Sequence, residues 1–530
     1  MNIFEWEYIT LIPPLLILLL VIFTRKVLLS LGVGILLTSI VINKGNILEA
    51  IGSIWGAFSS IFYADGEINT WNAYILIFLI LLGCMIAFVT MTGGTKSFSE
   101  MMLKRIRTRR ASQFFTGILG MLVFIDDYFS ALIVGQVSRP ITDAHKVSRA
   151  KLSYYIDTTS SPICVISPIS SWGAGIMGLM APVLIAAELN MSAFSGFIQT
   201  VPYNFYAISS IVVMFIVIIF KVDIGMMRDK EKEAIYHGSL VDESLDIPGE
   251  VDAEDLPILH GTYKGLIIPV TLLIITVFTM IIFTGYQESG YSFDFIKIFE
   301  NTKVTDSLVV GGLVSLIAAL IYYFKQSKQE DRFEAKNIGT GFIHGVRSML
   351  PAVYILTLAW MTGDLIAQMG TGDTMANIIN GASIPVGFML AVFFFVAGVM
   401  ALTTGTSWGS FGILIPIAGE IMTKLDAVDL IIPSIAAVLA GSVFGDHCSP
   451  ISDSTILSST GAGCNHIVHV LTQMPYAIIA AIVSLIGYVV LGFTSSLLIS
   501  LSVVIVLLII LTLLAYFFYK PIPRKKKKTV

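Results

Sequence analysis

Residues 445–463 read GDHCSPISDSTILSSTGAG, and this stretch decides how the rest of the chain is interpreted. It lies inside an apolar run long enough to cross a membrane, yet it holds two aspartates, a histidine, a proline and seven Ser or Thr hydroxyls. Each unsatisfied polar group in hydrocarbon costs several kcal/mol, so a broken helix survives there only where protein or a water-filled cavity surrounds it. The stretch therefore predicts an unwound segment that lines a cavity inside a membrane protein.

The composition of the whole chain agrees with this interpretation. Of its 530 residues 55% are hydrophobic and 13% are charged, and the mean hydropathy is +0.85. Soluble domains carry roughly 25% charged residues, so the composition excludes an ordinary soluble enzyme. The four cysteines lie in or beside apolar segments, and we expect small buried residues there and no disulfide framework.

Apolar runs of about 20 residues predict helices that cross the membrane. Nine runs meet this rule: 9–24, 27–42, 73–91, 197–220, 265–285, 306–324, 340–361, 467–492 and 494–519. Four further runs are interrupted: 112–138 and 384–423, which we expect to be re-entrant hairpins, and 152–180 and 428–463, which we expect to be broken helices that cross. The predicted fold is an all-α polytopic membrane protein with about 11 transmembrane helices plus two re-entrant hairpins.

The distribution of Lys and Arg predicts the orientation of these segments. Cytoplasmic loops are enriched in both residues, and the hairpin arrangement puts 28 of the 32 on one side, leaving only Lys44, Lys297, Lys303 and Lys424 on the other. A simple crossing by 112–138 would move the basic residues that follow it to the other side and weaken this asymmetry. We therefore expect a multi-pass protein of the cell membrane with the N-terminus outside and the C-terminus in the cytoplasm.

The chain also contains an internal repeat. At an offset of 288 positions, residues 157–175 (DTTSSPICVISPISSWGAG) match residues 445–463 at eight of 19 positions without a gap. At an offset of 280, residues 126–134 (DDYFSALIV) lie over residues 406–414 (TSWGSFGIL) as a weaker match. Because one hairpin would enter from each side, the copies form an inverted-topology repeat with two discontinuous helices. In secondary transporters this arrangement places the site near the midplane, where those helices face each other.

These features predict six parts of the chain. They are 1–69, N-terminal helices; 70–221, repeat one with a helix, hairpin, broken helix and helix; 222–264, a cytoplasmic loop; 265–338, connecting helices; 339–492, the inverted repeat two; and 493–530, a C-terminal helix with a basic tail. The loop is of mixed charge and typical of a solvated connector, with a regulatory element as the alternative. The tail is an orientation signal or a contact for anionic lipid head groups.

Aspartates in the first repeat are candidates for the site, because a carboxylate at membrane depth is costly unless it pairs with a cation or a proton. Asp126 and Asp127 lie at the expected tip of the first hairpin. The structural alternative for Asp126 is a cap bonded to nearby backbone amides. The first broken helix adds a run of polar residues before its proline: Asp157, Thr158, Thr159 and Ser160.

The second repeat supplies candidates at its hairpin tip and at its break: Thr404, Thr406, Ser407, Asp446, His447, Ser449, Asp453 and Ser454. Their oxygens suit a hard cation such as Na⁺, which we place at Asp446, Asp453 and Asp157. Competition of Na⁺ and H⁺ for one carboxylate would couple the two ions. The Ser and Thr hydroxyls equally suit the alternative role of satisfying freed backbone groups.

Histidines near the second break raise two further alternatives. His447 is a candidate for proton handling, since its pKa in water lies near neutrality, or a hydrogen-bonded structural histidine. The spacing of the neighbouring His and Cys residues does not match a tetrahedral zinc site, so we expect no transition metal. A hydrolase using Ser449 or Ser454 with His447 is disfavoured, because the repeats share a Ser-Pro motif whereas His447 has no counterpart in repeat one.

Four stretches together resemble a known family: residues 445–463, TTGTSWGSFGILIPIA (403–418), IDDYFSALIVG (125–135) and SWGAG (171–175). They are similar to the NhaC-type sodium/proton antiporter family within the ion-transporter superfamily, over residues 70–490. The resemblance implies a secondary active antiporter that exchanges Na⁺ for H⁺ by alternating access, with the five aspartates as its ion or substrate region. Relatives with similar signatures include sodium-lactate/proton-malate exchangers and amino-acid carriers. An ion-coupled carrier of a small organic anion or amino acid is therefore the alternative function.

The expected partners follow from this interpretation. They are Na⁺, H⁺ and the lipid bilayer, with a small carboxylate or amino acid in the alternative case. We expect no enzyme activity, no cofactor and no nucleic-acid partner. The sequence leaves a homodimer open.

Overall fold

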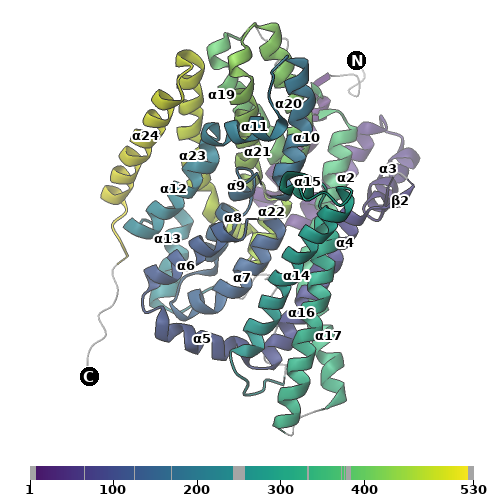
Figure 1. Cartoon of the computed structure of the whole chain (residues 1–530), viewed down its shortest axis with the longest axis vertical. Helices are drawn as coiled ribbons and strands as arrows, with labels where there is room; N and C mark the ends of the chain where they lie inside the picture. The colour runs from purple at the N-terminus through teal and green to yellow at the C-terminus, as the bar shows by residue number, and fades with distance from the viewer. Residues whose placement is uncertain are drawn as a thin grey trace.

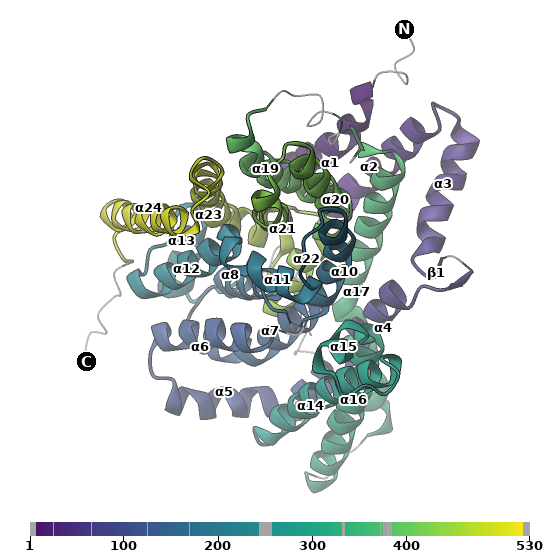
Figure 2. The same cartoon turned by 45° about the horizontal axis from the view of Figure 1, so that its top comes forward.

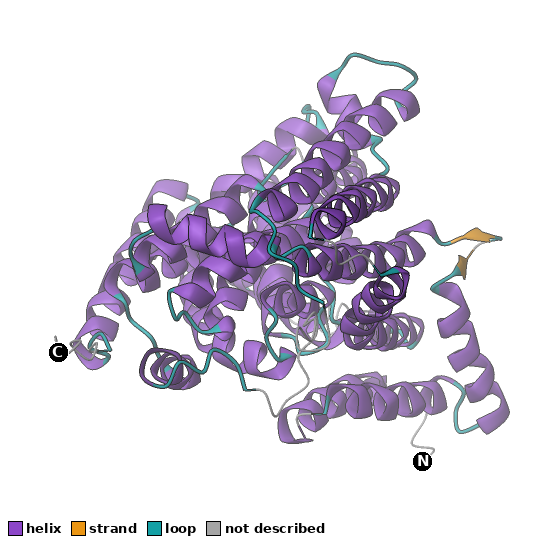
Figure 3. Ribbon diagram, turned by 90° about the horizontal axis from the view of Figure 1, so that it is seen from below, coloured by secondary structure: helices purple, strands orange, loops and turns teal. Residues whose placement is uncertain are grey.

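The structure is a computed structural model that describes residues 7–24, 26–64, 66–124, 126–168, 170–242, 257–330, 334–371, 373–374, 377 and 384–522. The described chain is helical almost throughout, as Figure 1 shows. Its first part comprises η2 (Glu7–Leu11), α1 (Ile12–Thr24), α2 (Val27–Ile42), α3 (Ile47–Ser60) and a short hairpin of β1 (Tyr63–Ala64) and β2 (Glu67–Ile68). Figure 3 shows that these strands project at the edge of the molecule.

The remaining helices follow in two series separated by a linking group. The first is α4 (Thr70–Met91), α5 (Gly94–Arg105), α6 (Arg109–Leu122), α7 (Asp127–Ala144), α8 (Arg149–Thr159), α9 (Ser161–Cys164), α10 (Ser171–Ala186), α11 (Ala193–Thr200), η3 (Val201–Tyr203) and α12 (Phe205–Phe220). The linking group is α13 (Gly225–Tyr236), α14 (Lys264–Glu288), α15 (Phe295–Glu300) and α16 (Val304–Gln329). The second is α17 (Ala335–Gln368), α19 (Val386–Thr404), α20 (Ser407–Lys424), η4 (Val428–Leu430), α21 (Ile431–Cys448), α22 (Asp453–Ala462) and α23 (His466–Thr494), and α24 (Leu497–Phe518) ends the chain.

Nine helices of the described chain are long and apolar enough to cross a membrane. This confirms the prediction of an all-α polytopic membrane protein. Three shorter apolar helices, Tyr8–Ile17, Leu28–Ile42 and Gly175–Ala186, lie where further crossings were expected. The count of about 11 crossings and the re-entrant course of the hairpins stay predictions, because length and apolar character alone do not define a bilayer.

Both predicted helix breaks are present, and each has a local cause. The first begins at Ser160, which leaves the helical conformation at φ −90° and ψ −91°, and Pro162 follows it. The second begins at Ser449, next to Pro450, and Ser452 caps the new helix by accepting a hydrogen bond from Thr455 N at 3.3 Å. Proline lacks an amide hydrogen, so Pro162 and Pro450 each remove a backbone donor at the break. Six other prolines lie inside continuous helices, so the neighbouring serines contribute to the breaks as well.

The two breaks differ in length beyond that motif. The first includes the short helix α9 before α10 begins, whereas α22 begins four residues after Ser449. As a result Ser170 caps α10, accepting a hydrogen bond from Gly173 N at 3.0 Å, while its sequence match Ser458 lies inside α22. The ungapped match therefore aligns the breaks but not the helices that follow them.

Two sequence predictions differ from the observed helices. The expected single helix at 197–220 is divided into α11, η3 and α12, because Pro202 interrupts it and Asn204 caps α12 with a 3.1 Å hydrogen bond from Ala207 N. The expected solvated loop at 222–264 begins with the folded helix α13, whose Glu231 is completely buried. Residues 243–256 of that loop, and the basic tail after residue 522, lie outside the described residues.

The centre of the molecule is formed by the broken helices and the helix pairs next to them. In Figures 1 and 2, α24 lies at one edge and α16 toward the other, with α8, α21 and α22 between them. Helix α7 packs against α22, and α20 packs against α10. At the first of these crossings a Cβ on Gly135 would lie 2.4 Å from the backbone of Gly461, so only two glycines allow this approach.

Candidate functional site

The tip between α6 and α7 holds two buried aspartates. Asp126 caps α7, accepting a 2.9 Å hydrogen bond from Phe129 N, which is the structural role foreseen as its alternative. Asp127 begins α7, and its two carboxylate oxygens accept hydrogen bonds from Trp172 Nε1 at 2.9 Å and from Ser161 Oγ at 3.5 Å. Asp127 therefore joins the first helix pair to the first break.

The second break holds another pair of buried aspartates. Asp446 lies in the last turn of α21, where its Oδ2 accepts hydrogen bonds from Ser407 Oγ at 3.0 Å and Ser454 Oγ at 3.4 Å. Its Oδ1 has no hydrogen-bond partner among the described residues. Asp453 begins α22, and it accepts hydrogen bonds from Tyr128 Oη at 2.5 Å and Ser454 N at 2.8 Å.

These four aspartates, Asp126, Asp127, Asp446 and Asp453, form one electrostatic group that we call the carboxylate cluster. Asp127 interacts with the charges of the other three, and all four are at most 7% exposed. Among the described residues, no Lys or Arg forms an ion pair with Asp127, Asp446 or Asp453. Buried negative charges without a counter-cation are strongly unfavourable, so this cluster favours the binding of cations or protons.

Asp157 lies in a second buried group, which we call the Asp157 network: Asp157, His447, Ser458, His469 and Gln473. Its Oδ1 accepts a 3.2 Å hydrogen bond from Ser458, and its Oδ2 lies 3.1 Å from His469 Nε2 and 2.6 Å from Gln473 Nε2. His447 Nε2 lies 3.0 Å from the backbone oxygen of Asp157. The network thus joins α8, α21, α22 and α23, and both oxygens of Asp157 have partners.

Ser458, His469 and Gln473 were not among the predicted site residues. A signal for two of them was present, because His469 and Gln473 are four residues apart and share one face of an otherwise apolar helix. Ser458 could be found only from the fold, since it approaches Asp157 from a segment 301 residues away in sequence.

Six of the eight predicted hydroxyls fall into two sets, those that donate to Asp446 and those that donate to backbone carbonyls. Ser407 and Ser454 bond to Asp446 in the carboxylate cluster, whereas Thr406 caps α20 through Trp408 N at 3.3 Å. Four others donate to backbone carbonyls: Thr159 to Tyr155, Ser160 to Ile156, Thr404 to Met400 and Ser449 to Leu402. The contacts of these four hydroxyls match the alternative role predicted from the sequence, which is to satisfy backbone groups freed at the breaks. Thr158 is buried next to Asp157 in α8.

The histidines near the second break have different partners: His447 and His469 contact Asp157, whereas His466 contacts the break itself. His466 lies 2.7 Å from the backbone oxygen of Pro450 and so holds the second break, while His447 contacts Tyr206 Oη at 3.0 Å. In the described part of the chain, no group of three or more His, Cys, Asp and Glu side chains could hold a metal ion. The four cysteines are buried and free, as the sequence predicts.

A cavity of about 490 Å³ reaches the carboxylate cluster. Its lining includes Asp453, Tyr128 and Thr406, together with Trp71 at the start of α4 and Asp364 near the end of α17. Of the four clustered aspartates, Asp453 is thus the one that lines this cavity. Because Trp71 is 42% exposed, the lining of the cavity extends from a surface residue to Asp453.

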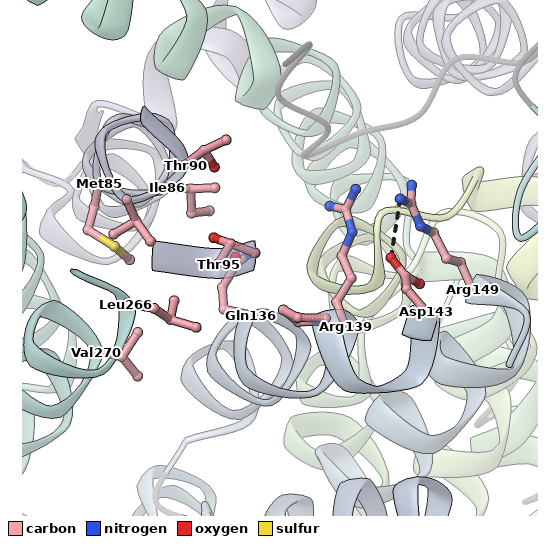
Figure 4. A pocket seen from close by; sticks show the side chains of 12 residues that line it. Met85, Ile86, Thr90, Thr95, Gln136, Arg139, Asp143, Arg149, Leu266 and Val270 are labelled. Atoms are coloured by element: carbon pink, nitrogen blue, oxygen red, sulfur yellow. Dashed lines mark hydrogen bonds and ion pairs between the residues drawn. The ribbon is translucent and has the colours of Figure 1, made fainter. Parts of the chain in front are cut away.

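A second cavity, of about 200 Å³, lies near the opposite end of α22 (Figure 4). It is lined by Arg139, Asp143 and Arg149, and Arg149 donates to Gly463 O at 3.3 Å and pairs with Asp143 at 3.4 Å. Helix α22 has 10 residues and is therefore about 15 Å long. The two cavities are thus separated by α22 and the helices packed on it.

Comparison with known proteins gives a consistent set of similarities. The sequence profile of the Na+/H+ antiporter family matches residues 163–493. An uncharacterized protein of Haemophilus influenzae is 40% identical over 491 residues, which are 92% of this chain and 91% of that protein. The chain is also 32% identical to the malate-2H(+)/Na(+)-lactate antiporter of Bacillus subtilis over 166 residues, 30% of this chain and 34% of that protein.

Two further similarities are weaker. An uncharacterized Na(+)/H(+) antiporter of Haemophilus influenzae is 33% identical over 153 residues, 28% of this chain and 31% of that protein. The crystal structure of the Alcanivorax borkumensis YdaH transporter aligns at 13% identity over 86% of this chain and 90% of that chain. Its TM-score of 0.35 is too low to assign a common fold.

Proposed function

The chain belongs to the Na⁺/H⁺ antiporter family, and from this premise we propose that it exchanges Na⁺ for H⁺ across the cell membrane by alternating access. The family match confirms the resemblance seen in the sequence. Together with the nine apolar helices of the described chain, it identifies a multi-pass membrane transporter.

The observation that carries the proposal is the carboxylate cluster at the end of the 490 Å³ cavity. Asp446 and Asp453 lie on either side of the second break, and the Ser407 and Ser454 hydroxyls donate to Asp446. Oxygen ligands of this kind suit a hard cation. Either Na⁺ or a proton neutralises the same buried negative charge, so binding of one disfavours binding of the other.

Asp157 has a different place in this proposal. Its carboxylate is occupied by Ser458, His469 and Gln473, which bind it from α22 and α23. We therefore assign Na⁺ to Asp446 and Asp453, and assign Asp157 the role of holding the two broken helices together. Asp126 and Asp127 contribute negative charge beside the ion.

The two cavities suggest how access alternates. The larger one leads to Asp453 at the first residue of α22, and the smaller one lies at Gly463 beyond its last residue. We propose that the repeats move relative to each other so that each cavity in turn reaches the cluster, as expected for inverted repeats.

The proposed orientation places the 490 Å³ cavity outside and Arg139 and Arg149 toward the cytoplasm. It is tested with single cysteines in place of Lys424 and Lys328 in intact cells. A membrane-impermeant maleimide is expected to label the first position only. Labelling of the second position alone would reverse the orientation.

A second candidate function is exchange of a small carboxylate coupled to ions. Two observations favour it: the similarity to the malate-2H(+)/Na(+)-lactate antiporter, and a 490 Å³ cavity that exceeds the needs of one dehydrated ion. In this case the carboxylate would occupy the cavity next to the cation.

Proteoliposomes with an imposed pH gradient distinguish the two functions. We expect Na⁺ alone to dissipate the gradient, measured with a pH-sensitive dye inside the vesicles. A response that requires malate, lactate or an amino acid in addition to Na⁺ would replace Na⁺/H⁺ exchange by the second function.

A further inference from the structure

A third cavity, of about 460 Å³, lies away from the ion site at the ends of α6 and α12. Among its lining residues are three cationic side chains, Arg109, Arg110 and Lys221, and one carboxylate, Asp223. We call it the basic cavity. The carboxylate is buried and bound by Lys151 at 2.5 Å, so its charge is already compensated.

Two of the three cations are not paired in this way. Arg109 pairs with the buried Glu231, but the ion pairs of the described chain include neither Arg110 nor Lys221. Arg110 donates one hydrogen bond to Ile219 O at 2.6 Å, and a guanidinium has five N–H donors. The basic cavity therefore carries a net positive charge available to an anion.

The position of the basic cavity corresponds to the lipid head groups. Lys221 directly follows Phe220, the last residue of the apolar helix α12. The side chains of Phe220 and Ile219 are each 41% exposed on the surface of the protein. The side chains of α24 that neighbour this region are also exposed and apolar, and Tyr516 contacts Phe220. Basic residues at the end of a lipid-facing apolar surface lie where anionic head groups are found.

A small apolar crevice of about 40 Å³ lies beside the basic cavity along α12. Its lining includes Val217 of α12, Tyr476 of α23, and Leu511 and Ala515 of α24. The crevice and the basic cavity are lined by residues that are adjacent in sequence. Val217 and Val222 line the crevice, and Ile218 and Lys221 line the basic cavity. The crevice suits the side of an acyl chain, while the basic cavity suits a phosphate.

We propose that the basic cavity and the crevice form a binding site for one anionic phospholipid, with the phosphate at Arg110 and Lys221 and an acyl chain between α12 and α24. Charge complementarity selects an anionic over a zwitterionic head group. Binding of this lipid is independent of which substrate the protein exchanges.

The first test is native mass spectrometry of the full chain in detergent with phosphatidylglycerol or phosphatidylcholine of identical acyl chains. The test variant is Arg110→Gln with Lys221→Asn, because Asn tolerates the positive φ of +57° at position 221. Loss of two cations is expected to weaken phosphatidylglycerol binding roughly 25-fold. The matched control, Lys325→Gln with Lys328→Gln on α16, removes the same charge and is expected to bind like the wild type.

The second test separates a lipid from a free phosphate. Ala515→Trp fills the crevice and leaves both cations in place, so it is expected to reduce phosphatidylglycerol binding without creating a response to inorganic phosphate. Three results would overturn the proposal: equal binding of both lipids, equal loss in the test and control variants, or inorganic phosphate that displaces phosphatidylglycerol while Ala515→Trp has no effect. Unchanged thermal unfolding of each variant establishes that the chain is folded.

Discussion

The carboxylate cluster and the Asp157 network are both buried and acidic, yet their aspartates are satisfied to different degrees. Asp157 has hydrogen-bond partners on both oxygens. Asp446 has partners on Oδ2, while its Oδ1 has none within the described residues. A buried aspartate whose bonds are complete stabilises the fold, whereas one that retains an open oxygen next to other carboxylates is suited to bind a transported ion.

We therefore expect substitution of Asp446 to abolish exchange and substitution of Asp157 to lower the stability of the fold. Asp446→Asn removes the charge that Na⁺ and protons share, and we expect exchange to fall to the background of empty vesicles. The measurement is Na⁺-driven proton flux in proteoliposomes. The matched control is Asp429→Asn, which removes an exposed carboxylate of η4 that does not line the cavity and should exchange like the wild type. Full activity of Asp446→Asn would remove this residue from the site.

The Asp157 network is expected to respond to a loss of hydrogen bonding. Asp157→Val removes the acceptor of His469 and one of the two acceptors of Gln473, whose Nε2 also donates to His447 O at 2.9 Å. Each buried hydrogen-bonding group left unpaired costs roughly 1–3 kcal/mol. We expect a lower thermal unfolding temperature in detergent and less protein in the membrane. Unchanged stability would show that these contacts do not hold the broken helices together.

Asp157→Asn separates a structural role from ion binding at the same position. The Asn side chain keeps one oxygen for His469 and Gln473, and its amide can donate to the Ser458 hydroxyl. We therefore expect a folded protein whose apparent Na⁺ affinity changes by less than about threefold, the scale of a weakened hydrogen bond. Loss of exchange in a stable Asp157→Asn protein would instead place Asp157 among the ion ligands.

A smaller effect is expected where a neutral group supports the cluster. Tyr128→Phe removes the hydroxyl that lies 2.5 Å from Asp453, without changing the charge. A typical hydrogen bond contributes about 0.5–1.5 kcal/mol, so the apparent Na⁺ affinity should change roughly 2- to 13-fold. The measurement is proton flux as a function of Na⁺ concentration, and an unchanged curve would show that Asp453 does not depend on Tyr128.

The smallest effect is expected at a hydroxyl whose partner is backbone. Thr404 lines the 490 Å³ cavity but donates to Met400 O at 2.9 Å. Thr404→Val keeps its shape, and we expect exchange within about twofold of the wild type because that hydrogen bond is local. A large loss would make this hydroxyl an ion ligand.

Much of this organisation could be predicted from the sequence, for physical reasons that differ from residue to residue. The Ser-Pro motifs predict both breaks, because proline removes a backbone donor and the polar residues around each motif supply alternative hydrogen bonds. Proline alone is not sufficient, since Pro140, Pro416 and four other prolines lie inside continuous helices. The carboxylates stand out because charge is rare in apolar runs. The division of 197–220 was missed although Pro202 gave a signal, since apolar length was given more weight than a single proline.

Other features depend on contacts that no local pattern contains. The pairing of Ser458 and Gln473 with Asp157 requires segments about 300 residues apart to meet, and the close crossing at Gly135 requires a second glycine, Gly461, on another helix. The prediction that Asp157 is an ion ligand rests on its charge and depth, which are the same for all buried aspartates, and it stays a prediction. The different role that we propose for Asp157 rests on the number of hydrogen-bond donors around its carboxylate.

The central claim is that Na⁺ and protons compete for the carboxylate cluster. Titration calorimetry of Na⁺ into the purified protein, repeated in two buffers of different ionisation enthalpy, measures the protons released on binding. We expect Na⁺ binding to release protons and to weaken as the pH falls, with neither signal in Asp446→Asn. Na⁺ binding without proton release in the wild type, or unchanged release in Asp446→Asn, would contradict the account.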